Sequence, residues 1–158
     1  MTNQSEIKTK RILILGMGNI LLGDEGVGVR AVEYLEKQKL PDYVDLLDGG
    51  TGGFTLLPEL LKYEEVILID ATLDDNPPGS IRVIKPKFAS DFPKAMSTHD
   101  IGLKDLIESA SILEKLPELH LIVVTIKDIQ PMDLHLSTEI EKKLPGVYQT
   151  VLKILNEI

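Results

Sequence analysis

The sequence predicts a single α/β domain of three layers, in which a mostly parallel, twisted sheet of about five strands carries helices on both faces. Two patterns within its 158 residues support this prediction. Short aliphatic runs of strand length alternate with segments whose apolar residues recur at helical spacing. Strands separated by helices are joined by right-handed crossovers and lie parallel in one sheet. The runs are almost continuously apolar, as expected when both faces of the sheet are covered.

The first half of the chain contains three expected strands. Residues 1–10 are predicted to be a flexible polar tail, and residues 11–158 to be the domain. The run 11–16 ends at a glycine and predicts a buried strand, and after a glycine-rich loop a helix is expected from Val27 to about Lys39. The other elements expected here are a strand over 43–48, a mobile loop over 49–53, a helix containing Leu56, Leu57, Leu60 and Leu61, and a strand over 65–72.

The second half adds two strands and two helical regions. A Pro-Pro-Gly turn leads into a short strand over 81–84, and a long irregular connection follows over 85–97. A helix is expected over 100–116 and a buried strand over 119–126. After a loop over 128–136, residues 137–158 are predicted to be helical with a break at Pro145-Gly146, because proline interrupts helices.

The composition excludes several classes of function. A net charge of −8 with no basic run argues against a nucleic acid partner. The absence of cysteine excludes disulfides, thiolate zinc sites and a cysteine nucleophile. The chain has neither a signal-peptide core nor an apolar run of the roughly 20 residues that a membrane helix needs. We therefore expect a cytoplasmic protein with no membrane partner and, given its acidic surface, a monomer.

The glycine loop after the first strand invites a dinucleotide-binding interpretation. That fingerprint, G-x-G-x-x-G, requires a third glycine where this chain has Leu21. Asp24 and Glu25 at the start of the following helix would repel a phosphate and attract a cation. Asp24 taken alone is equally well explained as a helix cap. Because Asp48 ends the second strand, where a ribose-binding acid would lie, a nucleotide-binding regulatory module remains an alternative.

Three potential metal ligands fall on loops expected at one edge of the sheet. In such folds the site lies beyond the carboxyl ends of the strands. Glu25 follows the first strand, Asp70 ends the third, and His99 lies just before or at the start of a helix. Each has an ordinary structural explanation, but together two carboxylates and an imidazole suit nickel, zinc or iron. A zinc hydrolase acting on another substrate is therefore a second alternative.

Other hydrolase signatures are absent. The sequence has no G-x-S-x-G nucleophile elbow and no H-E-x-x-H zinc motif. His120 lies within an apolar strand and is expected to be structural, whereas His135 lies in a loop and is expected to be exposed.

Four blocks of the sequence resemble the hydrogenase maturation protease family. The segment that begins Gly16-Met17-Gly18-Asn19 and continues to Asp24-Glu25 is similar to its signature G-x-G-N-x-L-x-x-D-[DE]. Its other hallmarks resemble Asp48-Gly-Gly-Thr-Gly52, Leu68-Ile-Asp-Ala71 and the histidine segment Thr98-His-Asp-Ile-Gly-Leu103. The blocks occur in the family's order and extend from about residue 11 to residue 126.

The resemblance implies an α/β endopeptidase that removes a C-terminal extension from the large-subunit precursor of a nickel–iron hydrogenase after nickel insertion. The family's metal-binding acids and histidine correspond to Glu25, Asp70 and His99, which are expected to be catalytic. The nickel is expected to arrive with the precursor and not to be held permanently. The residues expected to position the tail or orient the ligands are Asn19, Asp24, Asp48, Gly49, Gly50, Thr51 and Gly52.

Overall fold

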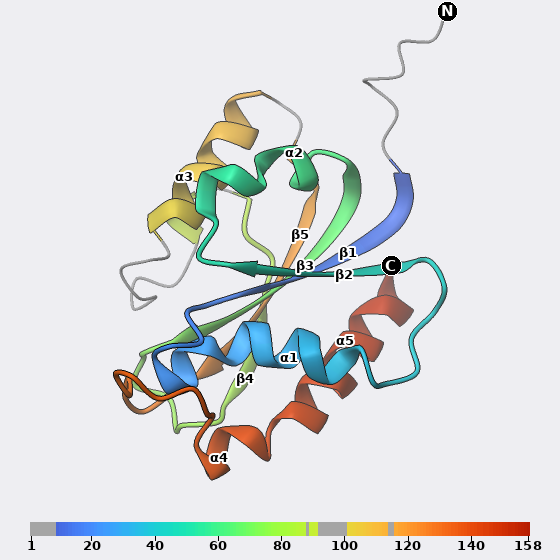
Figure 1. The fold of residues 1–158 in the computed structure, drawn as a ribbon. Coiled ribbons are helices and arrows are strands. Elements are labelled where there is room, and N and C mark those ends of the chain that lie inside the picture. The colour runs from blue at the N-terminus through green and yellow to red at the C-terminus, as the bar shows by residue number, and fades with distance from the viewer. Residues whose placement is uncertain (1–8, 88, 92–100, 114–115) are drawn as a thin grey trace, which may run out of the picture.

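Five strands form one sheet in the computed structural model, which describes residues 9–87, 89–91, 101–113 and 116–158 (Figure 1). They are β1 Thr9–Met17, β2 Val44–Gly50, β3 Tyr63–Thr72, β4 Ile81–Ile84 and β5 Glu118–Thr125, in the order β2-β1-β3-β5-β4. β2, β1, β3 and β5 are parallel, while β4 at one edge runs antiparallel to β5. The predicted sheet is therefore confirmed.

Helices cover both faces of this sheet (Figure 1). α1 Val27–Leu35 and α5 Leu144–Glu157 pack on one face, with the short α4 Thr138–Glu141 before α5. α2 Leu57–Leu60 and α3 Ile101–Ile112 pack on the other. Three 3-10 turns complete the described elements: η2 Gly23–Gly26, η3 Gly53–Leu56 and η4 Ala89–Asp91. None of the helices in the described residues is long and apolar enough to cross a membrane.

The core is divided by the sheet into two apolar clusters. In β1, Ile12 and Ile14 face α1 and α5, whereas Leu13 and Leu15 face α2 and α3. Successive side chains of a strand point to opposite faces, so a strand covered on both sides must be apolar throughout. This arrangement is the physical reason for the continuous aliphatic runs in the sequence.

The predicted helix break at Pro145-Gly146 is wrong. α5 begins at Leu144 and contains Pro145 in its first turn. Proline is compatible with that position because the N–H it lacks would have no partner within the helix. The interruption lies instead between α4 and α5, at Lys142 and Lys143.

Other boundaries differ from the predicted ones by a few residues. Gly49 and Gly50, predicted to lie in a mobile loop, belong to the end of β2. β3 begins at Tyr63, two residues earlier than predicted, and ends at Thr72 as predicted, so Asp70 lies within the strand. α1 ends at Leu35 and not near Lys39. Residues 1–8 of the predicted tail, and residues 88 and 92–97 of the predicted connection, lie outside the described residues, as do residues 98–100 and 114–115.

Candidate functional site

The turn from β1 into α1 is built on close backbone packing. A Cβ atom at Gly28, in the first turn of α1, would lie 2.2 Å from the carbonyl oxygens of both Met17 and Ile69. A Cβ atom at Gly16 would lie 2.2 Å from the carbonyl oxygen of Gly28. Only glycine permits such close approach. These glycines therefore place the start of α1 directly against the carboxyl ends of β1 and β3.

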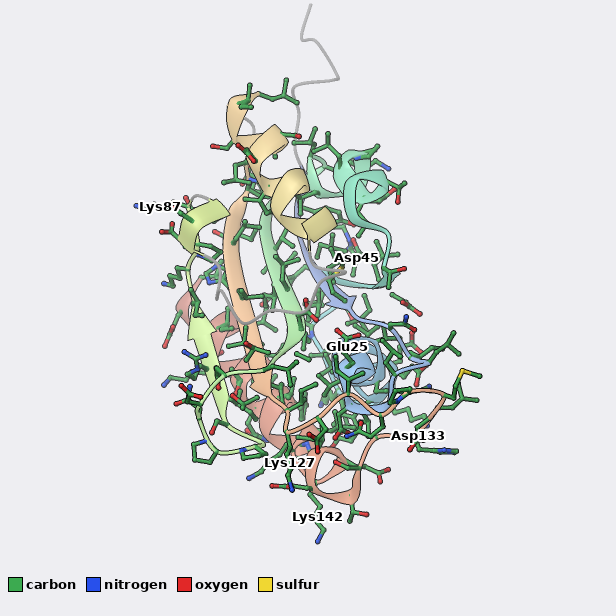
Figure 2. The ribbon with its side chains drawn as sticks, turned by 90° about the vertical axis from the view of Figure 1, so that its left-hand side faces the viewer. Glu25, Asp45, Lys87, Lys127, Asp133 and Lys142 are labelled. Atoms are coloured by element: carbon green, nitrogen blue, oxygen red, sulfur yellow. The ribbon has the colours of Figure 1, made fainter. Side chains whose placement is uncertain are left out.

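Glu25 and Asp70 are both buried near this edge of the sheet. Glu25 lies in η2, which packs against β3, and its side chain is beside the start of α1 (Figure 2). The two residues are 1% and 0% exposed, respectively. Glu25 Oε2 accepts a hydrogen bond from the Asn19 N–H at 3.2 Å, and Asp70 Oδ1 accepts one from the Ala71 N–H at 2.8 Å. Carboxylates that are so little exposed to solvent are stabilised by nearby hydrogen-bond donors or by a cation.

A pocket of about 440 Å³ opens beside the same turn. Its polar lining comes from Asn19 and, at the end of β2, from Asp48, Gly50 and Thr51. The two segments are joined because the Gly18 N–H donates to the Gly50 carbonyl at 2.9 Å. The Gly50 N–H in turn donates to Asp48 Oδ1 at 2.9 Å. The pocket thus brings together four of the predicted positioning residues, next to the backbone that contacts Glu25.

The remaining predicted positioning residues lie outside this lining. Gly49 and Gly52 form the turn after Asp48, where the Gly52 N–H donates to the Gly49 carbonyl at 2.9 Å. Asp24 is 2% exposed and points elsewhere: its Oδ1 accepts from the Ser137 N–H at 2.7 Å. The N-cap residue of η2 makes no side-chain hydrogen bond to the turn. Because the Asp24 carboxylate bonds Ser137, it links η2 to the segment after β5 and does not cap its own helix.

The histidines fall into two groups. His99, the third predicted ligand, lies outside the described residues. Within the part of the chain that the structure describes, no three His, Cys, Asp or Glu side chains are arranged to hold a metal ion. His120 is buried in β5 with its Nε2 2.8 Å from Glu65 Oε2, and His135 is exposed. Both placements confirm what the sequence predicted for these two residues.

A hydrogen-bond network centred on Asp74, which sequence patterns did not indicate, fixes the chain after β3. Asp74 Oδ1 accepts hydrogen bonds from Thr125 Oγ1 and the Asn76 N–H, both at 2.9 Å, and Asp74 pairs with Arg82. Burial acts to raise the pKa of Asp74, but the bonds from Asn76 and Thr125 and the charge of Arg82 outweigh it, and the pKa is lowered. Asp74 therefore joins the ends of β3 and β5 to β4.

No pattern in the sequence indicates the apolar half of the pocket or the partners of Asp24. The apolar lining consists of Ile20, Leu21 and Val29. The Asp24 N–H donates to Gln130 Oε1 at 2.8 Å, across 106 positions of sequence. No periodicity connects residues so far apart. The glycine at position 23, which packs on the Gln130 side chain, is the one local signal of this contact that we find in the described residues.

Comparison with known proteins gives consistent results. A family model described as hydrogenase maturation protease matches residues 29–154. The hydrogenase 2 maturation protease of Escherichia coli K12 is 35% identical over 150 residues, covering 93% of this chain and 92% of the relative. The structure of the hydrogenase maturating endopeptidase HybD from E. coli superposes with a TM-score of 0.85, at 36% identity and 93% coverage of each chain. HybD from Thermococcus kodakarensis, a [NiFe] hydrogenase maturation protease, gives 0.72 at 28% identity, covering 91% and 98%.

The fold and its relatives define a hydrolase that cleaves peptide bonds. Since the family model spans most of the chain, the chain belongs to the hydrogenase maturation protease family and is an endopeptidase of hydrogenase maturation. This assignment decides against the nucleotide-binding alternative, for which the glycine loop was the main support. The glycines serve instead to pack α1 against the strands.

Proposed function

We propose that this endopeptidase removes the C-terminal extension of the large-subunit precursor of a nickel–iron hydrogenase once nickel has been inserted. Family membership supports a substrate from hydrogenase maturation. The observation that carries the proposal is the pocket at the carboxyl edge of the sheet, whose lining includes Asn19, Asp48 and Thr51. Its volume of about 440 Å³ lies within the range of roughly 300–1,000 Å³ typical of ligand sites.

We further propose that Glu25, Asp70 and His99 engage the nickel that the precursor brings. Carboxylate oxygens and an imidazole suit a borderline divalent ion, and three protein ligands leave coordination positions for the precursor. The burial of Glu25 and Asp70 at 1% and 0% exposure supports this, because a cation offsets the cost of burying two carboxylates. A bound divalent ion would polarise the scissile carbonyl or lower the pKa of a water molecule.

The chain's own residues would hold the precursor tail and the ligands in place. Within the segment 49–52, Thr51 is exposed and lines the pocket, so it is the part of this segment that would meet an extended tail. Asp48 is held in position by the hydrogen bond from the Gly50 N–H. Asp24, through its bond to Ser137, fixes the turn on which Glu25 lies. Orienting contacts of this kind keep metal ligands in their productive geometry.

The direct test is to incubate the purified protein with large-subunit precursor, with and without nickel, and to measure the precursor by mass spectrometry. We expect only the nickel-loaded precursor to lose mass from its C-terminus. Equal cleavage of both forms would reject the nickel requirement. Cleavage of neither form would reject the proposed substrate.

Two further measurements separate the alternatives. A zinc hydrolase with the same ligands would retain zinc on purification, whereas a protease that meets nickel in its substrate should be largely metal-free by elemental analysis. We also propose that the protein is a monomer that meets the precursor transiently. Light scattering should then give a mass near 17.5 kDa.

A further inference from the structure

The turn that carries Glu25 is capped by a residue from a distant part of the chain. The first N–H groups of a helical turn have no partner within it, and Leu22, the N-cap of η2, makes no side-chain bond to them. The Asp24 N–H donates instead to Gln130 Oε1 at 2.8 Å. Asp24 is 2% exposed, so without this acceptor its N–H would be buried away from water.

The Gln130 side chain is itself held in one orientation. Its Nε2 donates to the Asp128 carbonyl at 3.0 Å, while its oxygen accepts from Asp24. Because the amide oxygen only accepts and the amide nitrogen only donates, these two contacts determine which way the group faces. The side chain also lies on Gly23, where a Cβ atom would be 2.3 Å from Gln130 Oε1.

The backbone of the same segment is bonded to the turn. The N–H groups of Glu25 and Gln130 both donate to the Leu22 carbonyl, each at 3.3 Å. The Gly23 N–H donates to the Asp133 carbonyl at 2.7 Å, and Leu22 forms a β-bridge with Asp133. In Figure 2, Asp133 lies on the loop that passes the end of the molecule where Glu25 is found. The backbone of Glu25 therefore shares its acceptor with the backbone of Gln130.

We propose that Gln130 is a positioning residue for hydrolysis, which caps the Asp24 N–H and thereby fixes the backbone that directs Glu25 towards the carboxyl edge of the sheet. This inference rests on the proposed function, in which Glu25 engages the metal brought by the precursor. A shift of about 1 Å in a group that positions the reaction is enough to lower a rate about 100-fold. The test must therefore separate the rate per folded molecule from stability.

The experiment uses variants of Gln130 in the full chain. Gln130→Met keeps the approximate length of the side chain and removes the amide, and Gln130→Asn has an amide that is one methylene shorter. Gln130→Glu retains an acceptor for Asp24 but loses the donor to Asp128. Lys127→Met, at an exposed position in the same segment, is the matched control. The measurements are kcat and KM with nickel-loaded precursor, urea unfolding, and hydrogen exchange of the Asp24 and Glu25 amides by NMR.

We expect Gln130→Met and Gln130→Asn to lower kcat per folded molecule by roughly 10–100-fold, as for other contacts that orient a ligand, with little change in KM. The Asp24 amide should lose its protection from exchange in both variants. Gln130→Glu should recover most of the lost kcat, and Lys127→Met should behave as wild type.

A normal kcat per folded molecule in Gln130→Met and Gln130→Asn would overturn the proposal, even if stability fell, because the contact would then be structural alone. An equal loss of kcat in Gln130→Glu would also overturn it, since the acceptor atom would not be the cause. If the wild-type protein does not cleave the precursor, the proposed function fails separately. Unchanged hydrogen exchange of the Asp24 and Glu25 amides in Gln130→Met and Gln130→Asn would then reject the proposal that Gln130 caps the turn.

Discussion

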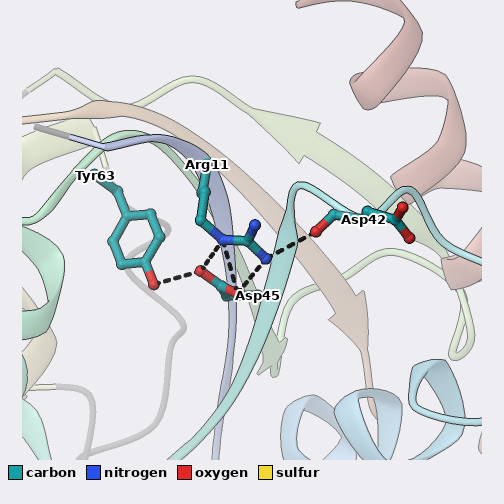
Figure 3. Close-up of polar contacts among 4 residues, drawn as sticks. All are labelled: Arg11, Asp42, Asp45 and Tyr63. Carbon is teal, nitrogen blue, oxygen red and sulfur yellow. Dashed lines mark hydrogen bonds and ion pairs between the residues drawn. The ribbon is translucent and has the colours of Figure 1, made fainter.

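The hydroxyl of Tyr63 on β3 donates a 2.8 Å hydrogen bond to Asp45 Oδ2 on β2, across the intervening strand β1 (Figure 3). Arg11, on β1, binds the same carboxylate at 2.8 Å and also donates to the Asp42 carbonyl at 2.8 Å. All three strands are thus joined at their amino ends, whereas the candidate site lies at their carboxyl ends. Stability and activity can therefore be probed at opposite edges of the sheet.

Ionisation of Tyr63 should lower the stability of the folded protein in alkaline solution. Burial, together with the hydrogen bond to Asp45, raises the pKa of Tyr63 to about 12. In the unfolded chain the phenol ionises near pH 10, so its contribution is complete below about pH 10 and is lost as the pH rises towards 12. We expect the free energy of unfolding to fall by on the order of 2 kcal/mol more in wild type than in Tyr63→Phe. Urea unfolding at a series of pH values measures this, and equal slopes would contradict it.

Asp45 should contribute a pH dependence of stability in acid. The hydrogen bond from Arg11, with a further contribution from Tyr63, lowers the pKa of Asp45. Its contribution to stability is therefore present above the ordinary Asp pKa of about 4 and is lost as the pH falls below that value. Asp45→Asn should flatten the decline of stability in this range. The exposed Asp75→Asn is the control, and because the ion pair is partly exposed, salt should reduce the difference.

Gly28 is predicted to be irreplaceable for packing. In Gly28→Ala the new methyl group would lie 2.2 Å from two backbone oxygens, and we expect a loss of about 3 kcal/mol or more in unfolding free energy. Gly146→Ala, also within a helix, is the matched control, because its Cβ would meet only the flexible end of Ile81 at 3.0 Å. That change should be neutral or stabilising by up to about 1 kcal/mol. Similar urea midpoints for the two variants would contradict the packing argument.

The candidate ligands can be tested singly. Glu25→Gln, Asp70→Asn and His99→Ala each remove a ligand while the first two keep the side-chain shape. We expect cleavage of nickel-loaded precursor to fall by well over the roughly 10–100-fold seen for orienting residues, with circular dichroism and melting near wild type.

His120→Ala is the control for these ligand variants. It should cost stability, since it removes the contact with Glu65, but leave cleavage per folded molecule intact. Normal cleavage by both Asp70→Asn and His99→Ala would reject the metal-site hypothesis.

The fold was predictable where burial on both faces leaves a strong pattern. The aliphatic runs of β1, β3 and β5 follow from their central places in the sheet. The helix break was not predictable, because the effect of Pro145 depends on whether it falls in the first turn or the interior of a helix.

The candidate site was predictable to the extent that parallel strands end at one edge. That rule brings Asn19 and Asp48 to one pocket. It does not reveal the partners of Asp24, since Gln130 and Ser137 lie 106 and 113 positions away and contact it through single hydrogen bonds. Contacts of that range leave no periodic trace in the sequence.

The distance in sequence between Asp24 and Gln130 has a consequence for a newly synthesised chain. A ribosome adds about 5–20 residues per second, so the 106 positions between them correspond to roughly 5–20 s of translation. During that interval the acidic turn exists without its cap, and until residue 125 has been added it also lacks β5 beside β3. A nascent chain thus cannot present the finished turn to a precursor until translation has passed residue 137, where the last bond to Asp24 is supplied.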